Sequence, residues 1–113
     1  MKLKINNQEQ ELNFGVRFVR ELDQVAGMNM QNFSFGMGLT RAIPALKTYD
    51  PAILSDVIYC ATFKNSPRVS HEAVDDFIDS ITSGKELGKL FDDVNAEMNE
   101  ANALKVALKN AQP

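Results

Sequence analysis

The feature that most constrains the fold of this chain is a nearly all-apolar stretch that follows Asp50–Pro51. Aspartate is a good N-cap and proline suits the first helical position, so this pair predicts the start of a helix. The apolar side chains that follow are Ile53, Leu54, Val57, Ile58 and Ala61. Because almost no side of this helix is polar, we expect it at the centre of the hydrophobic core.

The first fourteen residues alternate between apolar and polar side chains. Leu3 and Ile5 alternate with lysines. A polar segment, residues 6–10, follows, and Leu12 and Phe14 then resume the alternation. Alternation on both sides of a short polar loop predicts a β-hairpin. A lone hairpin is only marginally stable, so we expect its apolar face to lie against helices.

Residues 15–26 switch to helical periodicity. Phe18, Leu22 and Val25 form the apolar stripe, and Gly27 stands where a C-terminal helix cap is expected. This segment therefore predicts a helix directly after the hairpin.

Two more helices are expected before and after the apolar one. Residues 39–46 form a stripe that contains Pro44, which removes a backbone donor and predicts a kink or a very short helix. Ser70 is the expected N-cap of a later helix, with Val69 and Val74 placed for a hydrophobic staple. The positions that we expect to form turns and caps are Gly15, Gly27, Gly36, Gly38, Asp50, Pro51 and Ser70.

After Ser83–Gly84 the chain has no strong helix breaker. Its apolar residues recur at steps of three and four over about 26 residues, which predicts a helix of roughly 39 Å, longer than its own core needs. We interpret residues 1–84 as a hairpin and helical core, and residues 85–113 as a C-terminal helix and tail that could protrude, within one domain. The residues expected to contact a partner are Leu87, Leu90, Phe91, Val94, Met98, Leu104 and Leu108.

The fold class that follows is α+β and mostly α, with an N-terminal β-hairpin packed on about five helices and a long C-terminal helix. The composition agrees with a soluble single domain: 113 residues, 44% hydrophobic and 24% charged. No apolar run approaches the roughly 20 residues that cross a bilayer, and the N-terminus lacks the apolar region of a signal peptide. The single cysteine, Cys60, excludes an internal disulfide, so we expect a cytosolic protein.

The net charge of −3 is unevenly distributed. Residues 1–69 hold 8 basic and 6 acidic side chains, whereas residues 70–100 hold 2 basic and 9 acidic ones. An acidic second half repels nucleic-acid phosphates, so nucleic acid is not an expected partner.

The segment FSFGMGLTRAI, residues 33–43, raises the question of a phosphate-binding loop. A P-loop needs a lysine and a hydroxyl residue at the helix start, and a dinucleotide fingerprint needs a third glycine and a preceding buried strand. Here Leu39–Thr40–Arg41 follows Gly38, and residues 31–35 are too short and too polar for a central strand. We therefore interpret Gly36 and Gly38 as a turn into a helix.

Asp75, Asp76 and Asp79 form a DDxxD string. Such a string holds magnesium against a diphosphate in enzymes that ionise prenyl diphosphates. Those enzymes need a deep apolar cavity inside a much longer helical fold. The favoured interpretation is a helix with an acidic outer face.

The remaining reactive residues do not form a recognisable constellation. His71 is the only histidine, and no second histidine or cysteine stands at metal-ligand spacing. Cys60 lies in the most apolar segment, so we expect a buried, inert thiol with a raised pKa. Tyr49 and Tyr59 have no acidic or basic cluster around them. No enzyme activity, cofactor or metal is expected.

Several strings, taken in order, resemble one known family. They are NFGVRFVRELD (13–23), FGMGLTRAIPAL (35–46), DPAILSDVIYCAT (50–62), P-x-VS-x-E-x-VDDFID (67–79) and LFDDV (90–94). Their order and spacing are similar to those of the tail assembly chaperones of long-tailed, siphovirus-type phages and prophages of Gram-positive bacteria. The resemblance covers roughly residues 1–98.

The resemblance implies a non-enzymatic role in the host bacterial cytoplasm. Such chaperones bind the tape measure protein, keep it soluble, help to recruit subunits of the tail tube (major tail) protein, and are absent from the mature virion. In many members a programmed ribosomal frameshift also makes a longer form. The resemblance supplies no catalytic residues, and it leaves self-association open.

Two other functions stay open on the residues alone. One is a small helical adaptor or regulatory protein that binds a host or phage partner through the same acidic and apolar surfaces. The other is a small enzyme that uses Asp75, Asp76 and Asp79 with a metal ion.

Overall fold

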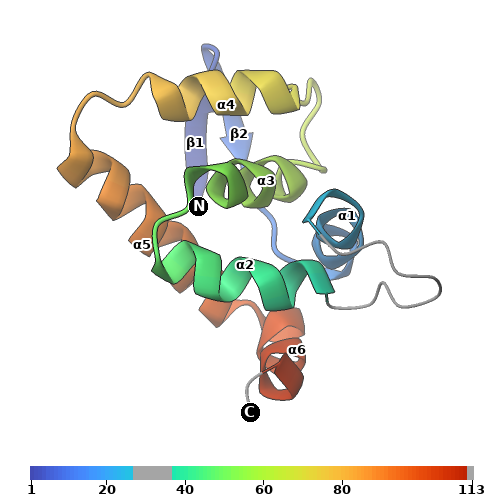
Figure 1. The fold of residues 1–113 in the computed structure, drawn as a ribbon. Helices are drawn as coiled ribbons and strands as arrows, with labels where there is room; N and C mark the ends of the chain where they lie inside the picture. Colours follow the sequence, from blue (N-terminus) through green and yellow to red (C-terminus); the bar gives the residue numbers. More distant parts are fainter. Residues whose placement is uncertain (27–36, 112–113) are drawn as a thin grey trace.

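The computed structural model of the chain describes residues 1–26 and 37–111, with side chains as far as residue 106. Over these residues, an antiparallel hairpin of β1 (Lys2–Ile5) and β2 (Gln8–Glu11) is followed by six helices (Figure 1). The helices are α1 (Val16–Ala26), α2 (Met37–Lys47), α3 (Pro51–Ala61), α4 (His71–Asp79), α5 (Gly84–Glu100) and α6 (Asn102–Ala111). The expected fold class is confirmed: the chain is mostly helical, with an N-terminal hairpin and a long helix, α5, in its C-terminal part.

α3 lies at the centre of the fold, as its apolar sequence predicts. Seven of its eleven residues are buried: Ile53, Leu54, Ser55, Val57, Ile58, Cys60 and Ala61. α1, α2 and α4 all pack against it, and Figure 1 shows it between α4 and α2. The residues of α3 that are not buried therefore lie on one side of the helix.

The starts of α3 and α4 are capped by side chains. Asp50 Oδ1 accepts hydrogen bonds from the backbone N–H groups of Ala52 (3.0 Å) and Ile53 (3.3 Å). Ser70 Oγ accepts one from the N–H of Ala73 (3.0 Å). These bonds satisfy donors that the first helical turn cannot pair, so they set where each helix begins.

The hairpin is tighter than the alternation predicts. β1 and β2 are joined by Asn6–Asn7 alone, whose φ angles of 55° and 62° suit the left-handed positions of a type I′ turn. The second strand is therefore Gln8–Glu11, with Ile5 opposite Gln8. The expected loop over residues 6–10 is wrong, and Leu12 and Phe14 follow the strand instead of forming it.

Two side-chain amides attach this polar strand to the segment between α3 and α4. Gln10 is only 1% exposed; its Nε2 donates to the Pro67 carbonyl (3.0 Å), and its Oε1 accepts from the Val69 N–H (3.4 Å). Asn65 Oδ1 accepts from the Glu11 N–H (3.0 Å), and its Nδ2 donates to the Glu11 carbonyl (2.9 Å). A buried glutamine is stable here because both ends of its amide are hydrogen-bonded.

α1 and α2 cross at Gly38 with no room for a side chain. A Cβ on Gly38 would lie 2.5 Å from the carbonyl oxygen of Leu22 and 2.8 Å from the backbone nitrogen of Asp23. The Gly38 N–H donates to Asp23 Oδ1 (2.9 Å), so the group that a phosphate would need is already bonded. Gly38 thus serves helix packing, while Gly27 and Gly36 lie outside the described residues.

α2 continues through Pro44 for eleven residues, so of the two expected alternatives the very short helix is wrong, and a kink at Pro44 stays a prediction. Proline removes the hydrogen bond to the carbonyl of Thr40. Thr40 and Pro44 are both exposed, so water can solvate that carbonyl.

The C-terminal segment is not one continuous helix. α5 ends at Glu100, Ala101 has an extended backbone (φ −73°, ψ 124°), and α6 begins at Asn102. The break lets α6 contact α2 as well as α5, and Leu104 is fully buried. The predicted single helix of about 26 residues is therefore wrong, and Asn99 and Asn102, which are poor helix formers, flank the break.

Gly38→Ala is expected to lower the free energy of unfolding by about 3 kcal/mol, because the added methyl group meets rigid backbone. Urea unfolding followed by circular dichroism measures the change. Gly88→Ala is the matched control, since Gly88 lies inside α5 and an added Cβ there meets nothing within 4 Å. That variant should gain about 0.5–1 kcal/mol from helix propensity. Equal unfolding midpoints for the two variants would show that the α1–α2 crossing relaxes without cost.

Candidate functional site

Arg68 joins three parts of the chain in a polar junction beside α3. Its Nη2 donates to the Glu21 carboxylate on α1 (2.7 Å) and to the Tyr59 carbonyl on α3 (2.9 Å). Its Nε donates to Thr62 Oγ1 (3.1 Å), and the guanidinium lies 4.1 Å from the centre of the Tyr59 ring. A planar guanidinium can make all these contacts at once. Arg68 therefore holds α1 against the end of α3.

His71, at the start of α4, also contacts Tyr59. The two rings are stacked, with centroids 4.7 Å apart and planes at 4°, and His71 Nε2 lies 3.0 Å from Asp56 Oδ1. Burial raises the pKa of the Asp56 carboxyl, and the nearby imidazole offsets this only in part. The expectation that Tyr59 has no acidic or basic cluster around it is wrong, because Arg68 and His71 both contact its ring. Arg68 belongs to the segment after α3, and His71 to the helix that follows this segment.

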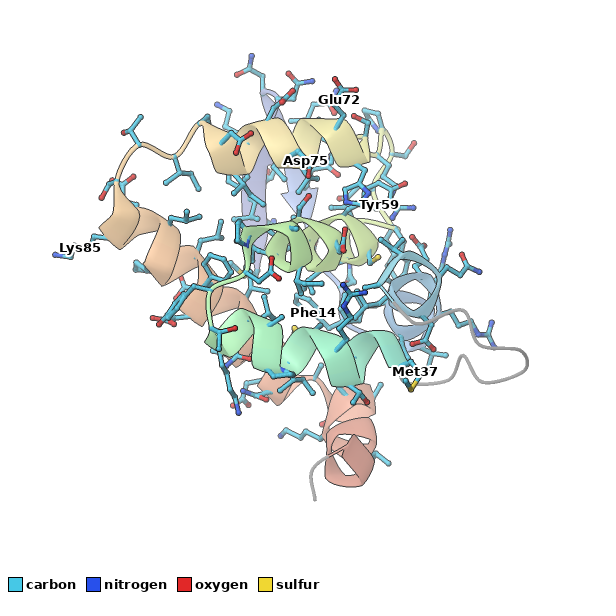
Figure 2. The ribbon with its side chains drawn as sticks, viewed as in Figure 1. Phe14, Met37, Tyr59, Glu72, Asp75 and Lys85 are labelled. Carbon is cyan, nitrogen blue, oxygen red and sulfur yellow. The ribbon has the colours of Figure 1, made fainter. Side chains whose placement is uncertain are left out.

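The acidic residues of α4 do not converge on one point. Asp75 lies on the α3 side of α4 (Figure 2) and accepts a hydrogen bond from Ser55 Oγ. Asp75 and Asp79 line a hollow of about 320 Å³ between α3 and α4, whereas Asp76 lines another, of about 540 Å³, between α4 and the hairpin turn. Among the residues that the structure describes, no three histidine, cysteine, aspartate or glutamate side chains are placed to hold one metal ion.

His71 and Cys60 do not form a nucleophilic pair. Within the described part of the chain, His71 has no hydrogen bond to a serine, threonine or cysteine. Cys60 is fully buried, and burial, with smaller effects of Glu21 and Asp56, raises the pKa of its thiol to about 12. Such a thiol stays protonated near neutral pH, which confirms the buried, inert cysteine that the sequence predicts.

The apolar residues expected to contact a partner lie mostly in this chain's own core. Leu87 is half-buried, the Leu108 side chain lies outside the described part, and the buried members are Leu90, Phe91, Val94, Met98 and Leu104. In this arrangement their apolar area holds α5 and α6 to the domain. The exposed side of the same segment includes Val106, which is 68% exposed.

A groove that the sequence analysis missed lies between α1 and α3. Its volume is about 540 Å³, and it is lined by Arg17, Arg20, Glu21, Gln24 and Val25 of α1 and by Tyr59 of α3. Val25 was expected in the apolar stripe of α1, but it is 41% exposed at the edge of this groove. Positions 17, 20, 21, 24 and 25 share one side of a helix, and this spacing was the available signal.

These features define a small, mostly helical protein whose described surface carries open hollows and charged faces. No helix in residues 1–26 and 37–111 has the length and apolar character needed to span a membrane. The chain belongs to the phage tail assembly chaperone protein (TAC) family, whose model matches residues 2–112. The resemblance drawn from the sequence is thus confirmed at the level of the family. A search of curated proteins and a search of solved structures found no match.

Membership in this family points to a non-enzymatic role in phage tail assembly inside the host cell. It also makes other phage tail proteins the class of partner.

Arg68→Lys is expected to lower the free energy of unfolding by about 2 kcal/mol, because an ammonium group cannot bond Glu21, Tyr59 and Thr62 together. Urea unfolding measures the effect. Arg20→Lys is the matched control, because Arg20 is exposed on α1 and has no hydrogen bond or ion pair with a described residue. An unchanged midpoint for Arg68→Lys would mean that the junction adds no stability.

Asp56→Asn is expected to leave the protein at least as stable as the wild type at neutral pH. The folded state raises the pKa of Asp56, so folding favours the protonated carboxyl. That stabilising contribution is complete below the unfolded pKa of about 3.9 and is lost as the pH rises through the folded value. Asparagine has the same shape and cannot ionise, so its advantage at neutral pH should shrink toward about pH 4.

Urea midpoints of wild type and Asp56→Asn at both pH values test this expectation. If the variant is the less stable protein at neutral pH, attraction between Asp56 and His71 outweighs the cost of burying the carboxylate.

Proposed function

We propose that this protein binds the tape measure protein of its phage before tail assembly, keeps it soluble, and helps to bring tail tube subunits to it. The proposal rests on family membership across residues 2–112. The protein acts in the host cytoplasm and is absent from the finished virion. Recruitment of the tail tube protein involves a longer form made by ribosomal frameshifting.

The proposed partner is long, helical and apolar. Such a partner exposes apolar stripes until it is assembled, and a helical protein with complementary grooves can cover them. The 9 acidic side chains of residues 70–100, against 2 basic ones, keep the outside of such a complex charged. Charge of one sign opposes association between neighbouring complexes and favours solubility.

The segment from Leu87 to Leu108 remains a proposed contact region. Because Leu90, Val94 and Leu104 hold the core together, its contribution to binding comes from the side that α5 and α6 leave exposed. Self-association through this segment is a separate property, and light scattering on the free protein measures it.

Co-expression with the tape measure protein of the same phage is expected to raise the soluble fraction of that protein and to yield a complex that co-purifies. The physical reason is that the chaperone covers apolar stripes that otherwise aggregate. The measurement is the soluble fraction of tape measure protein with and without this chain, followed by affinity purification through a tag on the chain.

The control for this experiment is co-expression with an unrelated acidic helical protein of similar size. Equal solubility in both arms, with no tape measure protein in the purified fraction, would exclude the proposed function.

A further inference from the structure

The groove between α1 and α3 follows one side of α1 for most of its length. Arg17 and Val25 mark its two ends, which are about 12 Å apart along the helix axis. Tyr59 forms the facing wall, and its ring is held by Arg68 (4.1 Å) and by the stacked His71 (4.7 Å). The wall is therefore fixed before any ligand arrives, which lowers the entropic cost of binding.

The charge of the groove is positive. Arg17 and Arg20 line it and Arg68 lies beside it, whereas Glu21 is the one carboxylate among its lining residues. Glu21 is already paired, at 3.3 Å from Arg17 and 2.7 Å from Arg68. Arg20 has no ion pair or hydrogen bond with a described residue, so its charge is available to a ligand.

The rest of the molecule strengthens this preference for an acidic ligand. Residues 70–100, which form α4, α5 and their connection, hold 9 acidic and 2 basic side chains. Carboxylates of a partner are repelled from that side and attracted to the arginines of α1. A nucleic acid fits less well, because a polyanion longer than the groove would meet the acidic side too.

The apolar end of the groove sets a second requirement. Val25 is 41% exposed and lies in the same groove as the Tyr59 ring. An apolar side chain of a ligand placed there would remove from water the Val25 side chain and the edge of the Tyr59 ring that Arg68 and His71 leave open. Arg17 and Arg20 are one helical turn apart, and Val25 lies beyond them along the same side.

We propose that this groove is the docking site for an acidic amphipathic helix of the tape measure protein. Carboxylates about one turn apart on that helix face Arg17 and Arg20, and an apolar side chain further along packs against Val25 and Tyr59. This inference rests on the proposed function, because it takes the partner from there.

Charge reversal at Arg20 tests the site. In a binding assay between the full chain and the tape measure protein of the same phage, Arg20→Glu should raise the dissociation constant about tenfold and flatten its dependence on salt. Lys85→Glu is the matched control, since it changes the net charge equally at an exposed lysine. Lys85 projects from the start of α5, on the side of the molecule opposite Tyr59 in Figure 2.

A second variant addresses the apolar end. Val25→Gln should also weaken binding, but without a change in salt dependence, because no charge is altered. Both substitutions are at exposed positions of α1, and urea midpoints close to that of the wild type will show that folding is intact.

The outcomes separate the two proposals. If wild type binds and Arg20→Glu binds equally well, the groove is not the docking site, and the proposed function stands. If wild type forms no complex, both proposals fail together. If Arg20→Glu leaves tape measure binding intact and lowers the molar mass of the free protein in light scattering, the groove contacts a second copy of this chain, which overturns the inference.

Discussion

The requirement to enclose α3 determines how the other elements are arranged. Seven of the eleven residues of α3 are buried, so the helix has apolar side chains on most of its sides. Such a helix is not stable at the surface of a domain, because apolar side chains left in water contribute no hydrophobic stabilisation. α1, α2 and α4 each cover part of it, and α5 and α6 extend the core through their contacts with α2. The two-stranded hairpin, too small to be stable alone, gains its stability from the same core through Ile5.

Polar side chains complete this enclosure where the chain leaves α3. The segment between α3 and α4 has no regular structure, yet Asn65 and Arg68 bond it to β2, α1 and the end of α3. Gln10 bonds the same segment from the hairpin. Because these bonds join distant parts of the chain, they fix the position of α1 relative to α3, and the groove between the two helices has a defined shape.

Local rules account for much of the fold. The apolar run of α3, its Asp50–Pro51 start and the Ser70 cap are visible in short stretches of sequence, and the structure places the helices there. The features that were missed depend on partners far away along the chain. Gln10 occupies a buried position in a polar strand because its hydrogen-bond partners lie 57 and 59 residues away. The break at Ala101 accompanies the burial of Leu104 and the contact of α6 with α2, which local periodicity does not reveal.

The same limit applies to the site. Glu21 and Arg68 are 47 residues apart, so the junction around Tyr59 could not be predicted from spacing. The groove was missed for a different reason: its residues have helical spacing, but their polarity resembles that of an ordinary solvent-facing side. The family, in contrast, could be identified, because a succession of packing and capping strings extends over most of the chain.

The amide of Asn65 has a consequence for how this protein can meet other chains. In the register of the hairpin, the N–H and carbonyl of Glu11 point away from β1, and both are bonded to Asn65. A third strand joining β2 would need those two groups, so the side chain of Asn65 closes the sheet edge at that point. The edge of β2 is thereby closed to strand addition at Glu11, which opposes aggregation through a shared sheet.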